Sequence, residues 1–210
     1  MNSNELKTAA LGAGTATMIA RVARSAGSVD DLIARIKSPD DTVRGPAWQN
    51  ADSYGAPAVK SLAQVMTDPD FEIARAAKRA LWKIVRYAGR PGAAGEAKAV
   101  TAQLIPLLAT RPAPVRREVL WMLSEIAGDE AVTPMTALLS DAEVRDDARC
   151  ALTRMPGDKV TAALKQAMGL VPEGFKFALA DSLRSRGEKV TGYPSRKLVP
   201  TKQTSVKAIG

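Results

Sequence analysis

The chain has 210 residues, of which 46% are hydrophobic and 25% are charged, with a formal net charge of +8. It contains 37 alanines, only three each of Trp, Tyr and Phe, and no histidine. Residues that favour β-sheets are therefore scarce, and the side chain that most often transfers protons near pH 7 or ligates metals is absent. One cysteine excludes an internal disulfide and a cysteine-based zinc site. We expect an all-α chain with no cofactor and no metal.

Residues 1–28 are predicted to form an N-terminal helix that caps the fold, with Leu11, Ile19 and Val22 on its packing face. The segment also faintly resembles an export signal, because Lys7 precedes the apolar stretch 9–20. That stretch contains a single leucine, and Glu5 lies in the basic region, so we expect a cytoplasmic protein with export as the alternative. No stretch reaches 18 apolar residues, which predicts no membrane span.

A helical pattern recurs five times between residues 29 and 188. In each copy an apolar anchor is followed four and eight residues later by apolar residues, which form one stripe of an α-helix. The anchors are Val43, Ile73, Val115, Val144 and Phe175; the residues at +4 are Ala47, Ala77, Val119, Ala148 and Leu179, and those at +8 are Ala51, Leu81, Leu123, Leu152 and Leu183.

The limits of these helices recur as well. Asp or Pro stands three residues before each anchor and suits a helix start, at Asp40, Asp70, Pro112, Asp141 and Pro172. A glycine that could close the helix in a left-handed conformation follows each anchor, at Gly55, Gly89, Gly128, Gly157 and Gly187. An earlier helix is marked by Leu32, Leu62, Leu104 and Leu164, and in the fourth unit by Met135, Leu138 and Leu139. We predict helix–turn–helix units at roughly 29–55, 56–89, 98–128, 129–157 and 158–187, with 90–97 as an inserted loop.

The segment from Thr133 to Arg145, with Ala148 and Leu152, resembles a HEAT repeat of the short bacterial type that is also found in phycobilisome lyases. The resemblance covers about three quarters of the chain and implies an α-solenoid with two helix layers and a concave binding surface. Stacking of several units agrees with this, because one helical pair cannot bury its apolar stripe alone. In that family an Asp and an Arg around the anchor often form a ladder between units. Asp40/Arg44 and Asp141/Arg145 fit that pattern, whereas Asp70 is offset from Arg75, and Arg116 and Lys176 lack the Asp.

The second helix of the second unit carries the sharpest local feature. Six basic residues fall within about 140° of arc, with Trp82 near its middle. We predict a partner-binding or polyanion-binding site here, formed by Arg75, Arg79, Trp82, Lys83, Arg86 and Arg90, with Lys78 on the same arc. The basic side chains would bind the negative charges of the partner, and the Trp82 indole would offer a stacking surface. The alternative is a solvated face on which Trp82 packs against a neighbouring unit under arginine stems.

The acidic residues of the fourth unit lack the spacing of a calcium loop, and we interpret them as helix-start acids. Cys150 has no base nearby in sequence, so we expect an inert, half-buried thiol. The end of the chain, 189–210, contains five basic and no acidic residues. We expect a basic, mobile tail, or an arm that lies along the fold or reaches an acidic partner.

The leading functional prediction is a non-enzymatic scaffold or adaptor that binds a protein partner on the concave second-helix surface of units 2 and 3. The alternative is a nucleic-acid binder, including a divergent HEAT-like DNA glycosylase. Enzymes of that kind combine this architecture with a basic groove, Trp residues and an Asp, for which Trp48, Trp82, Trp121 and Asp181 are the candidates here. A third class, a chromophore or cofactor lyase, would require a substrate pocket.

Overall fold

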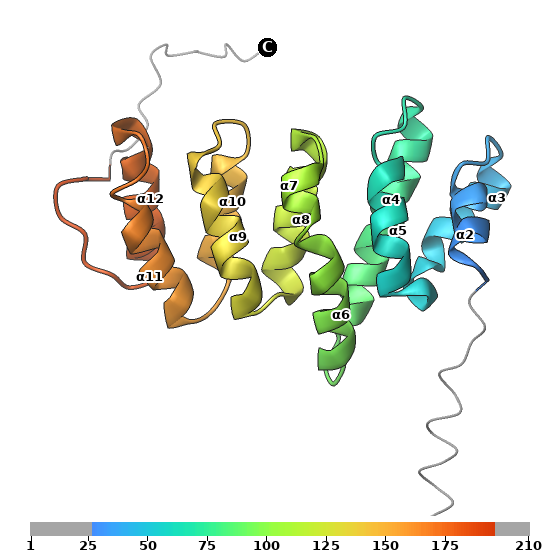
Figure 1. Ribbon diagram of the computed structural model, residues 1–210, viewed down its shortest axis with the longest axis horizontal. Helices are drawn as coiled ribbons and strands as arrows, with labels where there is room; N and C mark the ends of the chain where they lie inside the picture. The colour runs from blue at the N-terminus through green and yellow to red at the C-terminus, as the bar shows by residue number, and fades with distance from the viewer. Residues whose placement is uncertain (1–26, 196–210) are drawn as a thin grey trace, which may run out of the picture. The chain divides into compact units, whose positions relative to one another are not determined.

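Every regular element between residues 27 and 195, the part of the chain that the structure describes, is a helix. Figure 1 shows this computed structural model, and the prediction of an all-α chain is confirmed. The expected capping helix and weak export signal lie almost wholly in residues 1–26, and most of the expected tail lies in 196–210. Both segments are outside the described residues. None of the described helices combines the length and the hydropathy needed to cross a bilayer.

The chain divides into two compact units, Met1–Ala131 and Val132–Gly210. The first contains α2 (Val29–Ile36), α3 (Asp41–Gln49), α4 (Val59–Val65), α5 (Phe71–Ala88), α6 (Ala94–Leu104), α7 (Leu107–Thr110) and α8 (Ala113–Ile126), with short 3₁₀ turns η1 (Ala51–Tyr54), η2 (Ala56–Ala58) and η3 (Asp129–Ala131). The second contains α9 (Val132–Ala137), η4 (Leu138–Ser140), α10 (Arg145–Arg154), α11 (Asp158–Ala167) and α12 (Glu173–Ser185).

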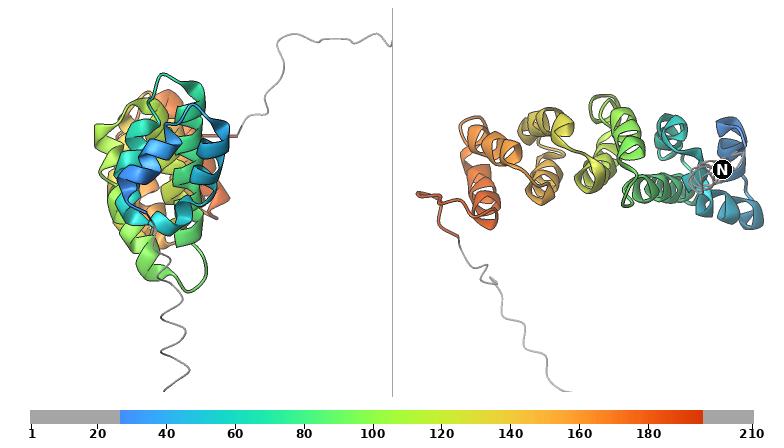
Figure 2. Two further views of the ribbon diagram at one scale, coloured as in Figure 1. Left: turned by 90° about the vertical axis from the view of Figure 1, so that its right-hand side faces the viewer. Right: turned by 90° about the horizontal axis from the view of Figure 1, so that it is seen from below.

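Successive helices pair within each unit. In the first unit α2 packs on α3, α4 on α5, and α6 and α7 on α8, while α5 also contacts both α3 and α8. In the second unit α9 pairs with α10 and α11 with α12, and α10 contacts α12. The right-hand view of Figure 2 looks along many of these helices, so that the pairs of each unit can be followed by colour. Within each unit, adjacent pairs therefore touch through their second helices.

The predicted apolar stripe forms the core. All ten residues at the +4 and +8 positions are buried, as are the four leucines of the earlier helices. A buried leucine contributes about 1.5–3 kcal/mol, and alanine at +4 in three of the units allows close approach of the helix axes. Val43 departs from the pattern, because 40% of it is exposed. The described residues place no helix pair ahead of α2 and α3, so nothing among them covers this anchor.

Four of the five helix starts follow the predicted caps. Asp141 is the exception, because α10 begins only at Arg145, directly after Val144, and Asp141 Oδ1 accepts the backbone N–H of Glu143 ahead of the helix at 2.9 Å. Asp40 Oδ1 accepts the backbone N–H of Thr42 at 2.8 Å, and Asp70 Oδ1 accepts those of Glu72 and Ile73 at 2.8 and 3.2 Å. The backbone and hydroxyl hydrogen bonds from Thr42 hold the pKa of Asp40 below its ordinary value. Pro112 and Pro172 directly precede α8 and α12.

The glycine prediction is correct for Gly55, Gly157 and Gly187, which have φ of 57°, 98° and 86°. It is wrong for Gly89 and Gly128, because neither adopts a positive φ. Gly89 has φ −79° and is required for a different reason. A Cβ there would lie 2.7 Å from Cγ2 of Ile126, so the end of α5 approaches α8 closely.

The inserted loop is shorter than predicted, because α6 already begins at Ala94. The chain after α12 runs back along that helix, as the dark orange segment of Figure 1 shows. The ring of Tyr193 packs edge-on against Phe177 with centroids 5.3 Å apart, and Arg184 donates to the backbone oxygen of Tyr193. Residues 189–195 of the predicted tail therefore lie against α12.

Candidate functional site

The predicted site lies on α5, the longest described helix. Asp70 caps its first turn, Glu72 and Arg86 complement the helix dipole at the two ends, and Ala, Leu, Lys and Arg in between favour helix. One face is buried, formed by Ala76, Ala77, Ala80, Leu81, Ile84, Val85 and Ala88. The basic residues occupy the remaining surface, as the sequence predicts.

Trp82 is held by the neighbouring helix pair. Its indole N–H donates to Oε2 of Glu118 on α8 at 2.9 Å, and Lys78 Nζ donates to Oε1 of the same carboxylate at 3.2 Å. The guanidinium of Arg86 lies over the indole, 5.0 Å from the ring centre. This geometry is the one expected from the alternative interpretation, in which Trp82 packs against a neighbouring unit beneath an arginine.

Two of the predicted site arginines are neutralised within the first unit. Arg75 pairs with Glu72 one turn earlier on α5. Arg90 donates to both carboxylate oxygens of Glu96, at 2.6 and 2.8 Å, and to the backbone oxygen of Tyr87 at 2.6 Å. The Arg90 hydrogen bonds lower the pKa of Glu96, and the carboxylate raises the pKa of Arg90. Arg90 thus fastens the connection between α5 and α6.

The other three cations form an exposed row that we call the cationic stripe, Arg79, Lys83 and Arg86. They lie at i, i+4 and i+7, and none forms an ion pair with a carboxylate of the described residues. Arg79 lies over Trp48 of α3 at 5.1 Å, as Arg86 lies over Trp82. Each such contact is worth about 0.5–1 kcal/mol at an exposed site. The arginines are therefore held in position with their charge still available.

An apolar hollow that the sequence did not predict lies between α5 and α8, in the part of α5 that precedes this row. We call it the α5–α8 pocket; it has a volume of about 230 Å³, and its lining residues are Met66, Phe71, Ala74, Arg75, Lys78, Pro114, Val115 and Glu118. Phe71 on its rim is 71% exposed. The one signal in the sequence is that Phe71 stands two residues before its anchor, where the other units carry Asp, Ala or Glu.

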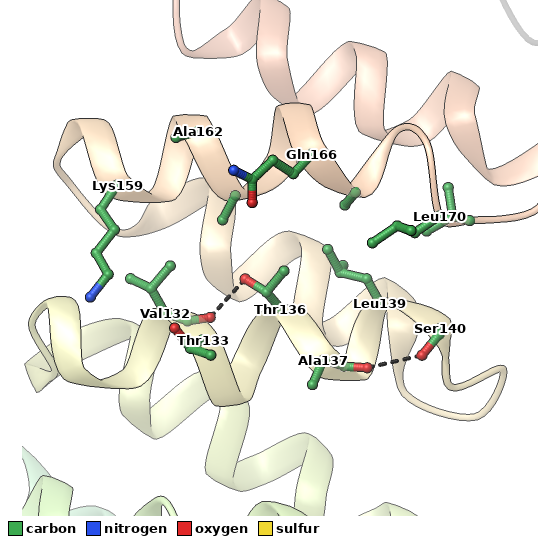
Figure 3. Close-up of a pocket in the computed structure, with 13 residues that line it drawn as sticks. Val132, Thr133, Thr136, Ala137, Leu139, Ser140, Lys159, Ala162, Gln166 and Leu170 are labelled. Carbon is green, nitrogen blue, oxygen red and sulfur yellow. Dashed lines mark hydrogen bonds between the residues drawn. The ribbon is translucent and has the colours of Figure 1, made fainter.

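A second hollow lies in the second unit, between α9 and α11 (Figure 3). It has a volume of about 460 Å³, and Leu170 in its lining is 79% exposed. Lys159 is the one charged residue of the lining, and no carboxylate or thiol joins it. The hydroxyls of Thr136 and Ser140 donate to backbone oxygens of their own segment, at 2.7 and 3.0 Å. The groove therefore brings no acid–base pair together.

Two side chains that the sequence analysis considered for chemistry have close polar partners. Asp181 pairs with Arg184 on α12 at 2.7 Å, and Arg149 donates to Sγ of the half-buried Cys150 at 3.2 Å. Within residues 27–195 no three ligand-type side chains lie close enough together to hold a metal ion.

Comparison with known proteins assigns neither a family nor a function to the chain. No protein-family model matches the chain, and no curated protein is detectably similar to it in sequence. The basis for a functional inference is therefore the surface of α5 and α8.

Proposed function

We propose that the chain is a HEAT-like α-solenoid of about five helix pairs and acts as a non-enzymatic adaptor that binds a protein partner. The binding surface is formed by α5 and α8 and comprises the cationic stripe and the α5–α8 pocket. The observation that carries this proposal is Phe71, a large aromatic side chain that is 71% exposed at the edge of an apolar pocket. Protein interfaces concentrate binding energy in aromatic and arginine residues near such pockets.

The HEAT-like assignment is supported by the order of helix contacts inside each unit. Equivalent helices of adjacent pairs touch, α3 with α5 and α5 with α8 in the first unit and α10 with α12 in the second. A chain of such contacts is what stacked helix–turn–helix units produce. In a HEAT-like solenoid these second helices would line the concave layer, where partners bind.

Nucleic-acid binding is the second candidate, and the cationic stripe is the observation that favours it. Three phosphate contacts would give a salt dependence with a slope of about −2.7 on a log–log plot for duplex DNA. A protein partner seated in the apolar pocket would depend less on salt. Two observations favour a protein partner over a nucleic acid. Arg75 and Arg90 are paired with carboxylates and offer less charge to phosphates, and the indole of Trp82 is already hydrogen-bonded.

Affinity capture from the native host, with and without nuclease treatment, tests the proposal. The informative variant combines Phe71→Ser with Arg79→Glu and Lys83→Glu. The matched control reverses two exposed charges on other helices, Lys60→Glu on α4 and Lys98→Glu on α6. We expect a protein that is captured by the native chain and by the control, resists nuclease, and is lost with the variant. Capture that ignores the variant, or that nuclease abolishes, contradicts the proposal.

A further inference from the structure

Resting on the proposed function, we infer that the partner contributes an acidic peptide segment with one large apolar anchor residue. The anchor enters the α5–α8 pocket, and the carboxylates of the segment bind the cationic stripe. Two independent observations meet in this assignment: an apolar cavity of defined size, and further along α5 a row of cations that forms no ion pair with any carboxylate of residues 27–195.

The size of the pocket selects a single side chain. Its volume of about 230 Å³ lies below the ~300–1,000 Å³ typical of small-molecule sites. Met66, Ala74 and Val115 supply apolar walls, and Phe71 extends the apolar surface outward from the rim. An aliphatic or aromatic side chain that enters would bury itself against these walls, and Phe71 would cover it.

The charges at the rim of the pocket do not compete for an ionic ligand. Lys78 is paired with Glu118 at 3.2 Å, and Arg75 is paired with Glu72. The rim therefore carries no net charge from these four residues, and the pocket favours an apolar group over a carboxylate. The available positive charge begins one turn further along α5.

The spacing along α5 sets the pattern of the partner segment. At ~1.5 Å per residue, the stripe begins ~6 Å from Arg75 and ends ~16 Å from it. An extended peptide advances ~3.3 Å per residue, so acidic residues within about five positions of the anchor face the stripe.

The two arginines of the stripe suit carboxylates for a further reason. Trp48 and Trp82 hold Arg79 and Arg86 in place, so that less side-chain freedom is lost on binding. The guanidinium groups present paired N–H donors that match a carboxylate. Lys83 between them adds a third cation one turn from each.

A nucleic acid fits this surface less well. Stacking of a base on Trp82 would compete with Arg86, which already lies over the indole. The rim of the pocket offers a phosphate backbone no net positive charge, because Lys78 and Arg75 are already paired with Glu118 and Glu72. A peptide can place its uncharged anchor there and its acids beyond it.

Selection from a displayed library of random peptides tests the inference. The native full-length chain is the target, and the Arg79→Glu/Lys83→Glu chain is the counter-target. We expect enriched peptides to contain an apolar residue with two or more acidic residues within about five positions. A synthetic version of the most enriched peptide should bind at least about tenfold more weakly to the Phe71→Ser chain, to the stripe variant, and after its own anchor is replaced by serine. The Lys60→Glu/Lys98→Glu chain is the matched control and should bind normally, and circular dichroism shows whether each variant is folded.

Selected peptides without an apolar residue or without net negative charge overturn the inference, and so does a selection that yields none. If the affinity capture still depends on Phe71 and the stripe, the adaptor proposal survives that result. Tight binding of an unrelated single-stranded oligonucleotide that requires the stripe overturns both the peptide assignment and the protein-partner proposal.

Discussion

Trp82 and Glu118 are joined by a hydrogen bond of 2.9 Å that spans two helix pairs. The same carboxylate accepts from Lys78, so that one acidic side chain on α8 holds two residues of α5. Lys78 and Glu118 also line the α5–α8 pocket, so this contact forms part of its wall. This carboxylate therefore contributes both to the packing of α5 on α8 and to the lining of the candidate site.

Removal of that carboxylate should cost stability. In Glu118→Ala the half-buried indole N–H and the ammonium of Lys78 lose their common acceptor, and we expect the free energy of unfolding to fall by about 1–2 kcal/mol. Glu118→Gln keeps an acceptor for the indole and loses the Lys78 ion pair, which is partly exposed and should cost less than about 1 kcal/mol. Urea unfolding followed by tryptophan fluorescence measures both. Equal losses in the two variants would contradict the role given to the hydrogen bond.

Alanine should have opposite effects at two nearby glycines. At Gly89 the added Cβ would meet Ile126 at 2.7 Å, so Gly89→Ala should destabilise the chain by about 1–3 kcal/mol through overpacking. At Gly95, in the first turn of α6, no atom lies within 4 Å of an added Cβ, and Gly95→Ala should stabilise by about 0.5–1 kcal/mol. Thermal unfolding of the two single variants provides the comparison. A Gly89→Ala chain that loses no stability would show that the approach of α5 to α8 at Gly89 is not tight.

Arg186 should be irreplaceable by lysine in the second unit. Its guanidinium donates to four acceptors, which are Thr161 Oγ1 and the backbone oxygens of Thr153, Met155 and Gly157, at 2.9, 3.0, 2.5 and 2.7 Å. An ammonium group cannot reach acceptors spread so widely, so Arg186→Lys should lower the free energy of unfolding by about 1–3 kcal/mol.

Lys189→Ala is the control for that substitution, because Lys189 is exposed and should change stability by less than about 0.5 kcal/mol. Chemical unfolding of both variants under one set of conditions shows whether the loss at Arg186 exceeds the loss at an exposed basic residue nearby. The assignment fails if Arg186→Lys unfolds at the same denaturant concentration as Lys189→Ala.

The ion pair of Arg90 and Glu96 should make the stability of the chain depend on acid. Hydrogen bonds from Arg90 hold the pKa of Glu96 below its ordinary value of 4.5 in the folded chain. A carboxylate with a lowered folded pKa stabilises the fold above its unfolded pKa, and this contribution is lost as the pH falls from about 4.5 through the folded value. Melting temperatures between pH 6 and pH 3 should therefore fall less steeply for Glu96→Gln, which starts from a lower value at pH 6. Parallel curves for the two proteins would exclude the contribution.

The helical period of the sequence was enough to predict most of the helices and their buried faces. Residues four and eight positions after an anchor share one helix face whatever the rest of the chain does, and all ten of them are buried. Exposure of Val43 was not predictable in this way, because it depends on what precedes the first pair. Gly89 was assigned a conformational role, whereas its contact with Ile126 depends on how closely two helices approach.

For the candidate site, the sequence predicted the row of basic residues on α5, but neither their partners nor the pocket. The arc on α5 follows from 100° per residue, but which cations keep their charge available depends on partners elsewhere. Glu118 is 36 residues from Trp82, and Glu96 reaches Arg90 because α6 begins earlier than the sequence pattern indicated. The α5–α8 pocket needed both the exposed ring of Phe71 and the side chains of the next pair. To predict such contacts one must know the side-chain rotamers and the crossing angles of the helices, and a periodic sequence pattern contains neither.

Residues 189–195 cover one side of α12 in the second unit. Tyr193 occupies the side of α12 that carries Phe177, and Arg184 donates a hydrogen bond to the backbone oxygen of Tyr193. A further helix pair added after Ser185 could pack on this side of α12 only if Tyr193 were displaced. A design that adds a helix pair against α12 should therefore delete residues 189–195, whereas a pair inserted ahead of α11 would leave their contacts intact.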